Sequence, residues 1–407
     1  MERDELAAWL RLTLSPGVGN SSACKLLAAF GLPQAIFSQS GQALTRVVST
    51  AQAQALLCEP PELGPLLDTT LAWLAHDAPG GIRRQIATLG DARYPQALLN
   101  LDDPPLMLYF LGAAGFKQNL APALMDSALA ATNNDAFQGQ IEPARSLAMV
   151  GSRNPTPQGI ANARQFACEL VQAGVTVVSG LALGIDGAAH EGALKGAAAH
   201  PAMGVTVAVV GTGVDRVYPK AHRALAHRIA AQGLLVSEYP LGTPPLTANF
   251  PKRNRLIAGL AQGTLVVEAA LKSGSLITAR LSNEQGKDVF AIPGSIHAAQ
   301  SRGCHALIKQ GAKLVESASD VLEELAWPVL QNDANVIAAN ADPVRVSGQF
   351  DHEPGLLDAL GFDPVGLDAL QARSGLDAAA LQAGLMGLEL DGLVARLAGG
   401  LFQRLGR

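Results

Sequence analysis

Six short apolar segments between residues 147 and 292 constrain the fold of this chain more than any other feature. Each is rich in β-branched residues, and helix-compatible stretches separate them, which is typical of buried parallel strands in βαβ units. The pattern therefore predicts an α/β fold with a doubly wound, mostly parallel sheet. The segments are LAMV (147–150), VTVVS (175–179), VTVAVVG (205–211), LLVSE (234–238), TLVVE (264–268) and DVFAI (288–292).

The chain is too long for one hydrophobic core, because 407 residues exceed the usual size of a single domain. Residues 1–78 contain short helical patterns broken by Gly and Pro, which predicts a helical domain. Residues 79–327 hold the strands, and residues 328–352 lose periodicity and are predicted to form a linker. Residues 353–407 show three short helical patterns and a Gly-Gly hairpin, which predicts a winged-helix domain.

The helical domain contains LSPGVGNSSACKLLAAFG (14–31), a helix, a Gly-rich turn and a second helix. This segment resembles a helix-hairpin-helix module, so the domain is expected to be of that type or SAM-like. In such modules the N–H groups of the turn bind a DNA phosphate. Gly-rich turns between helices are also common for structural reasons alone, and we favour the structural interpretation here.

Composition is that of an ordinary globular protein, with 48% apolar and 16% charged residues. The first residues, MERDELAAWLRL, are acidic, and no apolar run is long enough to span a bilayer, so we expect a cytoplasmic protein with no membrane partner. The four cysteines are far apart and form no CxxC pair, which disfavours both a disulfide framework and a four-cysteine zinc site.

The charge of the chain is unevenly distributed. Residues 145 to 315 contain 17 Lys and Arg against 8 Asp and Glu, a net charge of +9, whereas the rest of the chain carries 13 against 27, a net charge of −14. A basic centre between acidic flanks indicates a polyanionic partner for the centre, with solvated surface charge as the alternative.

Small, polar or charged residues follow nearly every predicted strand. Because the carboxyl ends of parallel strands share one edge of the sheet, where ligands bind in open α/β folds, these residues predict the position of the site. They are Gly151-Ser152-Arg153, Ser179-Gly180, Gly211-Thr212-Gly213, Ser237-Glu238, Glu268 and Pro293-Gly294-Ser295.

Two of these turns have the features of a phosphate-binding loop. In GSRNPTPQG (151–159), Gly151 allows a phosphate to approach the backbone, Ser152 can donate a hydrogen bond, and Arg153 can bind phosphate with two N–H groups. In KSGSLITAR (272–280), Lys272 precedes Ser273, Gly274 and Ser275 at the start of a helix. A Ser that only caps this second helix remains an equal alternative.

The segment FPKRNRLIAGL (250–260) places cations where a helix disfavours them. Pro251 suits the start of a helix, so Lys252, Arg253 and Arg255 fall near its positive N-terminal end. We interpret these cations as residues that bind an external phosphate, which would offset their unfavourable position. Tyr218, Tyr239 and Phe250 lie beside basic residues and could stack bases, with core packing as the alternative, equally weighted for Phe250.

Several enzyme motifs are incomplete. VVGTGVDRVYP has Arg216 where the dinucleotide fingerprint needs its third glycine, and no Walker A motif occurs. The eight histidines form no H-x-x-x-H or H-E-x-x-H, so no metal, cofactor or catalytic residue is predicted. Asp186 and His190 are interpreted as a helical i, i+4 contact.

Eight motifs in one order resemble the DNA-processing protein A (DprA/Smf) family. They cover about residues 145–315 and read GSR, SGLALGID, GTGVDRVYPK, SEYPLG, FPKRNRLIAGL, VVEA, SGSLITAR and VFAIPGSI. The resemblance implies a helical domain, an extended Rossmann domain and a winged helix. It also implies a homodimer that binds single-stranded DNA without sequence preference in natural transformation. Such a protein protects incoming strands and helps load a RecA-type recombinase on strands covered by single-strand-binding protein.

The resemblance places a basic pocket on Arg153, Lys220, Arg253, Asn254 and Arg255, and Lys252 adds charge. With the two turns and Phe250, the predicted DNA-binding residues are Gly151, Ser152, Arg153, Lys220, Phe250, Lys252, Arg253, Asn254, Arg255, Lys272, Ser273, Gly274 and Ser275. Two positions depart from the family, because His222 and His305 stand where Asn is usual.

Two other functions remain as alternatives. A nucleotide-cleaving phosphoribohydrolase of the lysine-decarboxylase-like Rossmann group also has Arg and Glu at strand ends, but it needs PGGxGTxxE, and here the turn is PGSIHAAQSRG. Glu268 and Arg153 would then act alone. A scaffold with an incidental basic face would show no salt-dependent binding. The segment DAAALQAGLMGLELDG (377–392) contains no Lys or Arg, so we expect the winged helix to contact protein rather than duplex DNA.

Overall fold

The computed structural model describes residues 2–76, 81–116, 139–141, 143–198, 206–327, 354–397 and 399–405. Its centre is a nine-stranded sheet in the order β1-β2-β8-β7-β6-β5-β9-β10-β11. The seven strands from β8 to β11 are parallel, and β1 and β2 form an antiparallel pair at one edge. The predicted mostly parallel sheet is confirmed, and β1 and β2 add an antiparallel pair to the six predicted strands.

The six predicted strands all occur in the sheet. They are β5 (Ser146–Val150), β6 (Thr176–Ser179), β7 (Thr206–Val209), β8 (Leu234–Ser237), β9 (Gly263–Val266) and β10 (Asp288–Ala291). The sheet also contains β1 (Arg83–Thr88), β2 (Met107–Gly112) and the short β11 (Lys313–Leu314), and β3 (Ala114–Phe116) pairs separately with β4 (Gly139–Ile141).

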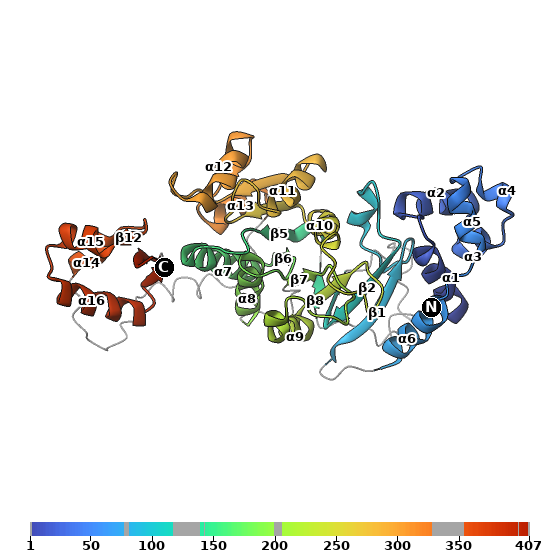
Figure 1. Cartoon of the computed structure of the whole chain (residues 1–407), viewed down its shortest axis with the longest axis horizontal. Coiled ribbons are helices and arrows are strands. Elements are labelled where there is room, and N and C mark those ends of the chain that lie inside the picture. Colours follow the sequence, from blue (N-terminus) through green and yellow to red (C-terminus); the bar gives the residue numbers. More distant parts are fainter. Residues whose placement is uncertain are drawn as a thin grey trace.

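Helices cover both faces of the sheet (Figure 1). On one face lie α7 (Pro157–Gln172), α8 (Ile185–Ala197) and α9 (Arg223–Gln232), and α13 (Ala318–Glu324) packs beside α7. On the other lie α10 (Asn249–Leu260), α11 (Ser275–Glu284) and α12 (Arg302–Lys309). Within β5, Leu147 and Met149 join the first core and Ala148 and Val150 the second, as the two-residue repeat of a strand requires.

The N-terminal helices pack beside the antiparallel edge of the sheet (Figure 1). Their apolar side chains, including the fully buried Trp9, belong to the same core as α7 and α8, and Trp73 contacts Tyr109 of β2 edge-on at 6.3 Å between ring centroids. These helices are α1 (Arg3–Leu14), α2 (Asn20–Phe30), α3 (Pro33–Phe37), α4 (Gly41–Leu44), α5 (Thr50–Leu57) and α6 (Leu63–Ala75).

The C-terminal part is a winged helix with its own core. Leu360, Leu370, Leu381, Leu385 and Phe402 are buried among the core side chains. The elements are α14 (Pro354–Leu360), β12 (Val365–Gly366), α15 (Leu367–Ser374), α16 (Ala378–Leu390), β13 (Val394–Leu397) and β14 (Leu401–Arg404). The predicted three helices and hairpin are confirmed here, whereas the predicted linker at 328–352 lies outside the described residues.

None of the helices in the described ranges combines the length and apolar character that a membrane span needs.

Candidate nucleic-acid interface

The strand order reverses between β5 and β9, which makes this pair the switch point of the sheet. The chain proceeds from β5 through β6 and β7 to β8 in one direction, then returns so that β9 pairs with the other side of β5. Crossovers on the two sides of this pair diverge, leaving a crevice at the carboxyl ends of the strands. A cavity of about 460 Å³ lies there.

The cavity gathers ten of the thirteen residues that the sequence predicted for DNA binding. Three elements supply them: the loop after β5, the start of α10, and the loop between β9 and α11. They are Gly151, Ser152, Arg153, Phe250, Arg253, Asn254, Lys272, Ser273, Gly274 and Ser275. The structure therefore brings together segments more than a hundred positions apart in the chain, while Lys220, Lys252 and Arg255 lie outside this cavity.

A carboxylate holds the loop after β5 in place. Glu268 accepts a hydrogen bond from the backbone N–H of Thr156 at 2.9 Å and another from its hydroxyl at 2.5 Å, one on each carboxylate oxygen. The backbone N–H of Ser152 donates to the carbonyl of Glu268 at 2.7 Å. Burial raises the pKa of Glu268, and the bonds from Thr156 oppose that rise. Glu268 therefore fixes the position of the loop that carries Arg153.

Arg153 is exposed at the mouth of the cavity and forms no ion pair with any described residue. Its guanidinium carbon lies 5.9 Å from the centroid of the Phe250 ring, within the range of a cation–π contact. The nearest acid in the cavity is Asp186, which is buried and accepts a bond from the N–H of Ala182 at 3.3 Å. Burial raises the pKa of Asp186, while Arg253 opposes the rise. The buried guanidinium of Arg253 therefore partly balances the charge of this acid.

The three aromatic candidates differ in exposure. The rings of Tyr218 and Phe250 lie 5.4 Å apart between centroids and are tilted by 36°, and Tyr218 is 48% exposed. Tyr239 is buried, and its hydroxyl donates to the carbonyl of Asn249 at 3.3 Å. Tyr239 is thus a core residue, whereas Tyr218 and the half-buried Phe250 form an accessible pair beside Arg153.

The expectation that Arg253 awaits an external phosphate is wrong. Arg253 is only 3% exposed, and its Nη1 donates to the carbonyl of Gly180 at 2.6 Å and to that of Val209. Burial lowers the pKa of Arg253 to about 10. Arg253 lines the cavity, but it mainly ties α10 to the carboxyl ends of β6 and β7.

The same expectation is wrong for Arg255. Its guanidinium donates to the buried carboxylate of Glu238, and its Nε lies 3.3 Å from Asp103. Burial raises the pKa of Glu238, and Arg255 opposes the rise. The physical reason is the helical period: two positions along a helix point about 200° apart, so Arg253 and Arg255 cannot face one phosphate together.

The position of α10 also explains why its cations are tolerated. The helix begins at Asn249, two residues before the start that Pro251 indicated, so Arg253 and Arg255 lie beyond the first turn. The unfavourable effect of the helix dipole on a cation falls off within that turn. Lys252 stays exposed, and its Nζ lies 5.9 Å from the ring centroid of Tyr239.

The loop before α11 offers donors to a ligand. Gly274 is the N-cap of α11 and no side chain caps the helix, while Ser273 Oγ accepts from the N–H of Ser275 at 3.3 Å. Within the described chain, the N–H of Gly274 has no hydrogen-bond partner, and Lys272 is exposed with no carboxylate partner. The loop thus has features of both interpretations of this segment. Ser273 makes a local hydrogen bond, and the N–H of Gly274 is a free donor close to Lys272 in the chain.

The Gly-rich turn between α1 and α2 makes hydrogen bonds with other parts of the protein. Gln52 donates to the carbonyl of Gly17 at 2.8 Å, and Asn20 at the start of α2 donates to the carbonyl of Asp103 at 3.4 Å. Asn20 also opposes the rise that burial causes in the pKa of Glu238. These contacts support the structural interpretation of the turn, because Gln52 ties it to α5 and Asn20 ties it to the loop before β2.

Three histidines have structural partners. His222 and His305 contact the carbonyls of Leu181 and Gly294 at 3.0 and 2.9 Å. His190 is fully buried and contacts Thr206 Oγ1 at 2.8 Å, while Asp186 lies one turn before it in α8, as the sequence predicted. Thr206 itself donates to a strand carbonyl, which makes Nδ1 of His190 the donor.

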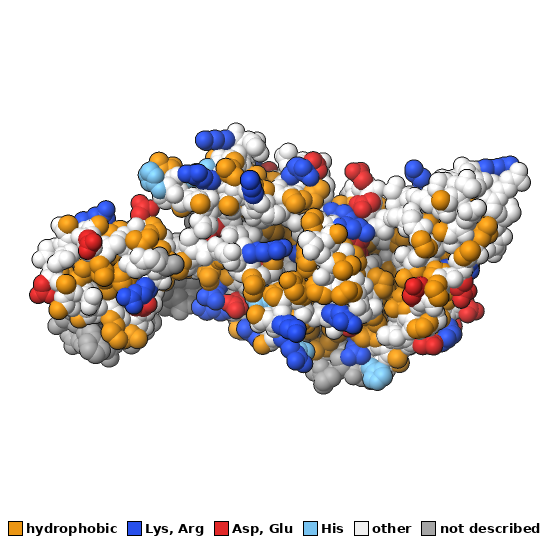
Figure 2. All heavy atoms as spheres, in the orientation of Figure 1, with side chains coloured by type: hydrophobic (Ala, Val, Ile, Leu, Met, Phe, Trp, Pro, Cys, Tyr) orange, Lys and Arg blue, Asp and Glu red, His pale blue; other side chains and the backbone are white. Residues whose placement is uncertain are grey.

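The distribution of surface charge agrees with the position of the cavity. Figure 2 shows Lys and Arg side chains over the middle of the molecule, whereas Asp and Glu gather beside the N-terminal helices. No described group of three His, Cys, Asp or Glu is arranged to hold a metal ion.

Comparison with known proteins gives consistent matches. A family model described as DNA recombination-mediator protein A matches residues 136–326, and one described as DprA winged helix domain matches residues 348–400. Protein Smf of Synechocystis sp. is 36% identical over 345 residues, 79% of this chain and 80% of that protein. The DNA processing protein DprA of Streptococcus pneumoniae is 49% identical over 181 residues, 44% of this chain and 62% of the relative.

The solved structures agree with these sequences. The X-ray structure of DNA processing protein A from Streptococcus pneumoniae has a TM-score of 0.57 and 31% sequence identity, and the match covers 80% of this chain and 98% of that chain. Sequence identity over four fifths of a relative, two family models in the same order and a shared fold lead to one conclusion: the chain belongs to the DNA-processing protein A (DprA/Smf) family.

Proposed function

We propose that this chain binds single-stranded DNA without sequence preference, with the cavity at the switch point holding the sugar–phosphate backbone. The observation that carries the proposal is the convergence of Arg153, Lys272 and the free N–H of Gly274 on that cavity. Guanidinium, ammonium and backbone N–H groups are the donors that phosphate oxygens prefer. The Tyr218–Phe250 pair beside them offers a surface for unpaired bases, whose stacking needs no particular sequence.

The phosphoribohydrolase alternative is disfavoured by the bonding of Glu268. An enzyme of that kind would need this carboxylate as an acid or base, but both of its oxygens accept bonds from Thr156. We therefore propose a binding protein that makes and breaks no covalent bond.

Family membership supports the rest of the proposal. We infer a cytoplasmic homodimer that protects incoming strands in natural transformation and passes them to a RecA-type recombinase, with single-strand-binding protein as a further partner. The domain boundaries at residues 78, 327 and 352 remain predictions. Recombinase filament assembly on covered single strands, measured with and without this protein, tests the handover, and light scattering tests the dimer.

Binding of labelled oligo-dT, measured against salt by fluorescence anisotropy, tests the central proposal. Arg153→Ala should weaken binding at least about ten-fold and reduce the log–log salt slope by roughly 0.7 for each phosphate that the variant no longer neutralises. Arg46→Ala is the matched control, because Arg46 is exposed in the turn between α4 and α5. Hydrolysis of nucleoside monophosphates without oligonucleotide binding would favour the enzyme, and neither activity would favour the scaffold.

The winged helix is proposed to contact protein. Its third helix, α16, presents Met386 at 65% and Leu390 at 80% exposure and carries no Lys or Arg. Apolar side chains exposed to this extent favour a protein surface, and the acids Asp377, Glu389 and Asp391 disfavour a phosphate backbone. Residues 353–407 should therefore not shift duplex DNA in a gel at physiological salt, and a clear shift would contradict this role.

A further inference from the structure

Helix α9 presents cations to solvent without a single carboxylate. Its sequence, RALAHRIAAQ, contributes the exposed residues Arg223, His227 and Arg228. The 3-10 turn at Lys220–His222 runs directly into this helix, so Lys220 precedes Arg223 by three positions and His227 follows by four. Residues at these spacings lie on one side of a helix. Across the described residues, no carboxylate pairs with Lys220, Arg223 or Arg228.

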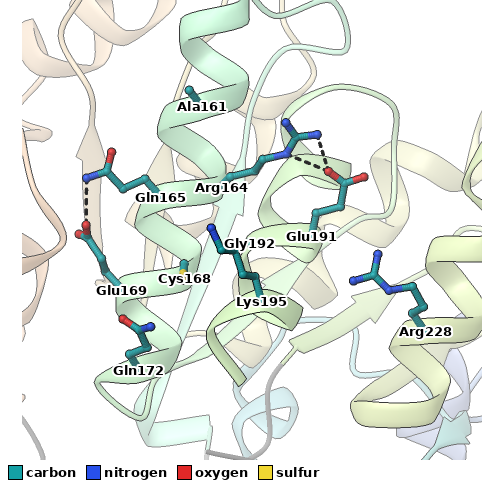
Figure 3. Close-up of a pocket in the computed structure, with 10 residues that line it drawn as sticks. All are labelled: Ala161, Arg164, Gln165, Cys168, Glu169, Gln172, Glu191, Gly192, Lys195 and Arg228. Atoms are coloured by element: carbon teal, nitrogen blue, oxygen red, sulfur yellow. Dashed lines mark hydrogen bonds and ion pairs between the residues drawn. The ribbon is translucent and has the colours of Figure 1, made fainter. Parts of the chain in front are cut away.

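Arg228 lies on a different side of α9 from Arg223 and lines a groove between α7, α8 and α9. A cavity of about 570 Å³ lies there, and Figure 3 shows Arg228 reaching from α9 toward α8, where Lys195 lies in the last turn. Both acids of the groove have partners. Glu191 accepts two bonds from Arg164 at 2.9 and 2.6 Å, and Glu169 accepts one from Gln165 at 2.9 Å.

Three cations and two acids line the groove, so its net charge is +1: Glu191 pairs with Arg164, whereas the neutral Gln165 leaves the charge of Glu169 in place. Because Glu191 already neutralises Arg164, the charges of Lys195 and Arg228 are the ones available to a ligand. A ligand that fits must carry negative charges spaced along an extended path, since α9 and the end of α8 form a strip of surface. A polynucleotide backbone has that form.

A series of neighbouring residues connects this strip to the switch-point cavity. Arg153 lies over Phe250, Phe250 lies 5.4 Å from Tyr218, and Tyr218 precedes Lys220 by two residues. Two accessible rings therefore lie between the cations Arg153 and Lys220 along this route. Rings that stack bases require those bases to be unpaired, which favours a single strand over a duplex.

Resting on the proposed function, we propose that α9 and Lys195 form a second backbone-binding segment. A strand held in the switch-point cavity leaves it across Phe250 and Tyr218 and then follows Lys220, Arg223 and Arg228 toward Lys195. The switch-point cavity binds the first nucleotides, and the α9 segment binds phosphates that only a longer strand can place there.

Oligonucleotide length separates the two segments. We would measure binding of oligo-dT of about 6 and about 25 nucleotides to the full chain, using Arg223→Gln/Arg228→Gln and, separately, Lys195→Gln. The double variant should bind the longer strand roughly ten-fold more weakly, with a salt slope smaller by about 1.4 because two phosphates are no longer neutralised. Its affinity for the short strand should stay within about two-fold of the wild type, and Lys195→Gln should show a smaller loss of affinity in the same direction.

Controls keep the two proposals distinguishable. Arg46→Gln removes one charge from the N-terminal domain, as Lys195→Gln does from α8, and should change neither affinity. Wild-type binding of the longer strand by the double variant would overturn the α9 segment, and so would equal losses of affinity for both lengths or a larger loss for duplex DNA. Failure of the proposed function itself would appear as no salt-dependent binding by the wild type, or no effect of Arg153→Ala at either length.

Discussion

The guanidinium of Arg253 lies directly against the backbone of Gly180. A Cβ at position 180 would come within 2.6 Å of both Nη atoms of Arg253. The close approach leaves no room for a side chain, because Arg253 is held in place by the carbonyls of Gly180 and Val209. Glycine at this strand end therefore permits an internal arginine to approach, rather than a ligand.

Gly180→Ala should consequently lower stability. The added methyl group would displace the buried guanidinium and break its bonds to two carbonyls, which we expect to cost about 1–3 kcal/mol. Urea unfolding at neutral pH measures the change. Gly242→Ala serves as a comparison, since space is open there but φ is +80°, so only backbone strain should contribute. An unchanged unfolding midpoint for Gly180→Ala would contradict this close packing.

Tyr218 should contribute to DNA affinity through its ring rather than its hydroxyl. Tyr218→Ala is expected to weaken oligo-dT binding by about 1–3 kcal/mol, the usual value of a base stacked on an aromatic ring. Tyr218→Phe should keep nearly full affinity, because the ring and its contact with Phe250 remain. Equal losses of affinity for the two variants would indicate a hydrogen bond instead of stacking.

The buried pair of Arg255 and Glu238 should matter for stability and not for direct DNA binding. Arg255→Ala would leave the Glu238 carboxylate buried without its cation, at an expected cost of about 3–5 kcal/mol. Replacing both residues, as in Arg255→Met with Glu238→Leu, should recover much of that stability. Folded protein carrying both replacements should bind oligo-dT with nearly wild-type affinity, and a large loss of affinity would restore Arg255 to the DNA-binding set.

His190 should make the protein sensitive to acid. Burial lowers its pKa to about 3 from an ordinary value of 6.5, so between these values the unfolded chain binds a proton that the folded chain does not. Stability from this group is complete above about pH 6.5 and is lost as pH falls toward 3, by at most about 1.4 kcal/mol per pH unit. Urea unfolding between about pH 7 and 5 should show a shallower decline for His190→Gln, and identical slopes would contradict the assignment.

The sequence predicted the sheet well because strand patterns are local. Six apolar runs predicted the six central strands, and small residues at their ends predicted the edge where the cavity lies. The position of the antiparallel pair β1 and β2 was harder to predict, because β2 joins the sheet by pairing with β8, more than a hundred residues away. Such pairing depends on tertiary contacts, which cannot be predicted from the residues of one segment alone.

The roles of the individual cations could not be obtained from the same patterns. Arg253 and Arg255 look alike in FPKRNR, but one faces carbonyls of β6 and β7 and the other faces Glu238. A helical wheel would have separated them by direction, since two positions differ by about 200°. It would not have identified Glu238 or Asp103 as partners, because those residues reach α10 only after the sheet has formed.

The two hydrogen bonds from Thr156 to Glu268 have an energetic consequence for ligand binding. Glu268 follows β9 and Thr156 follows β5, so one carboxylate locks the two loops together before any strand arrives. A rigid receptor loses little conformational entropy when it binds a ligand. The free energy of the contacts with DNA should therefore not be offset by the cost of ordering these loops. The mobile partner in the encounter is then the nucleic acid, whose own loss of freedom sets the entropic cost of capture.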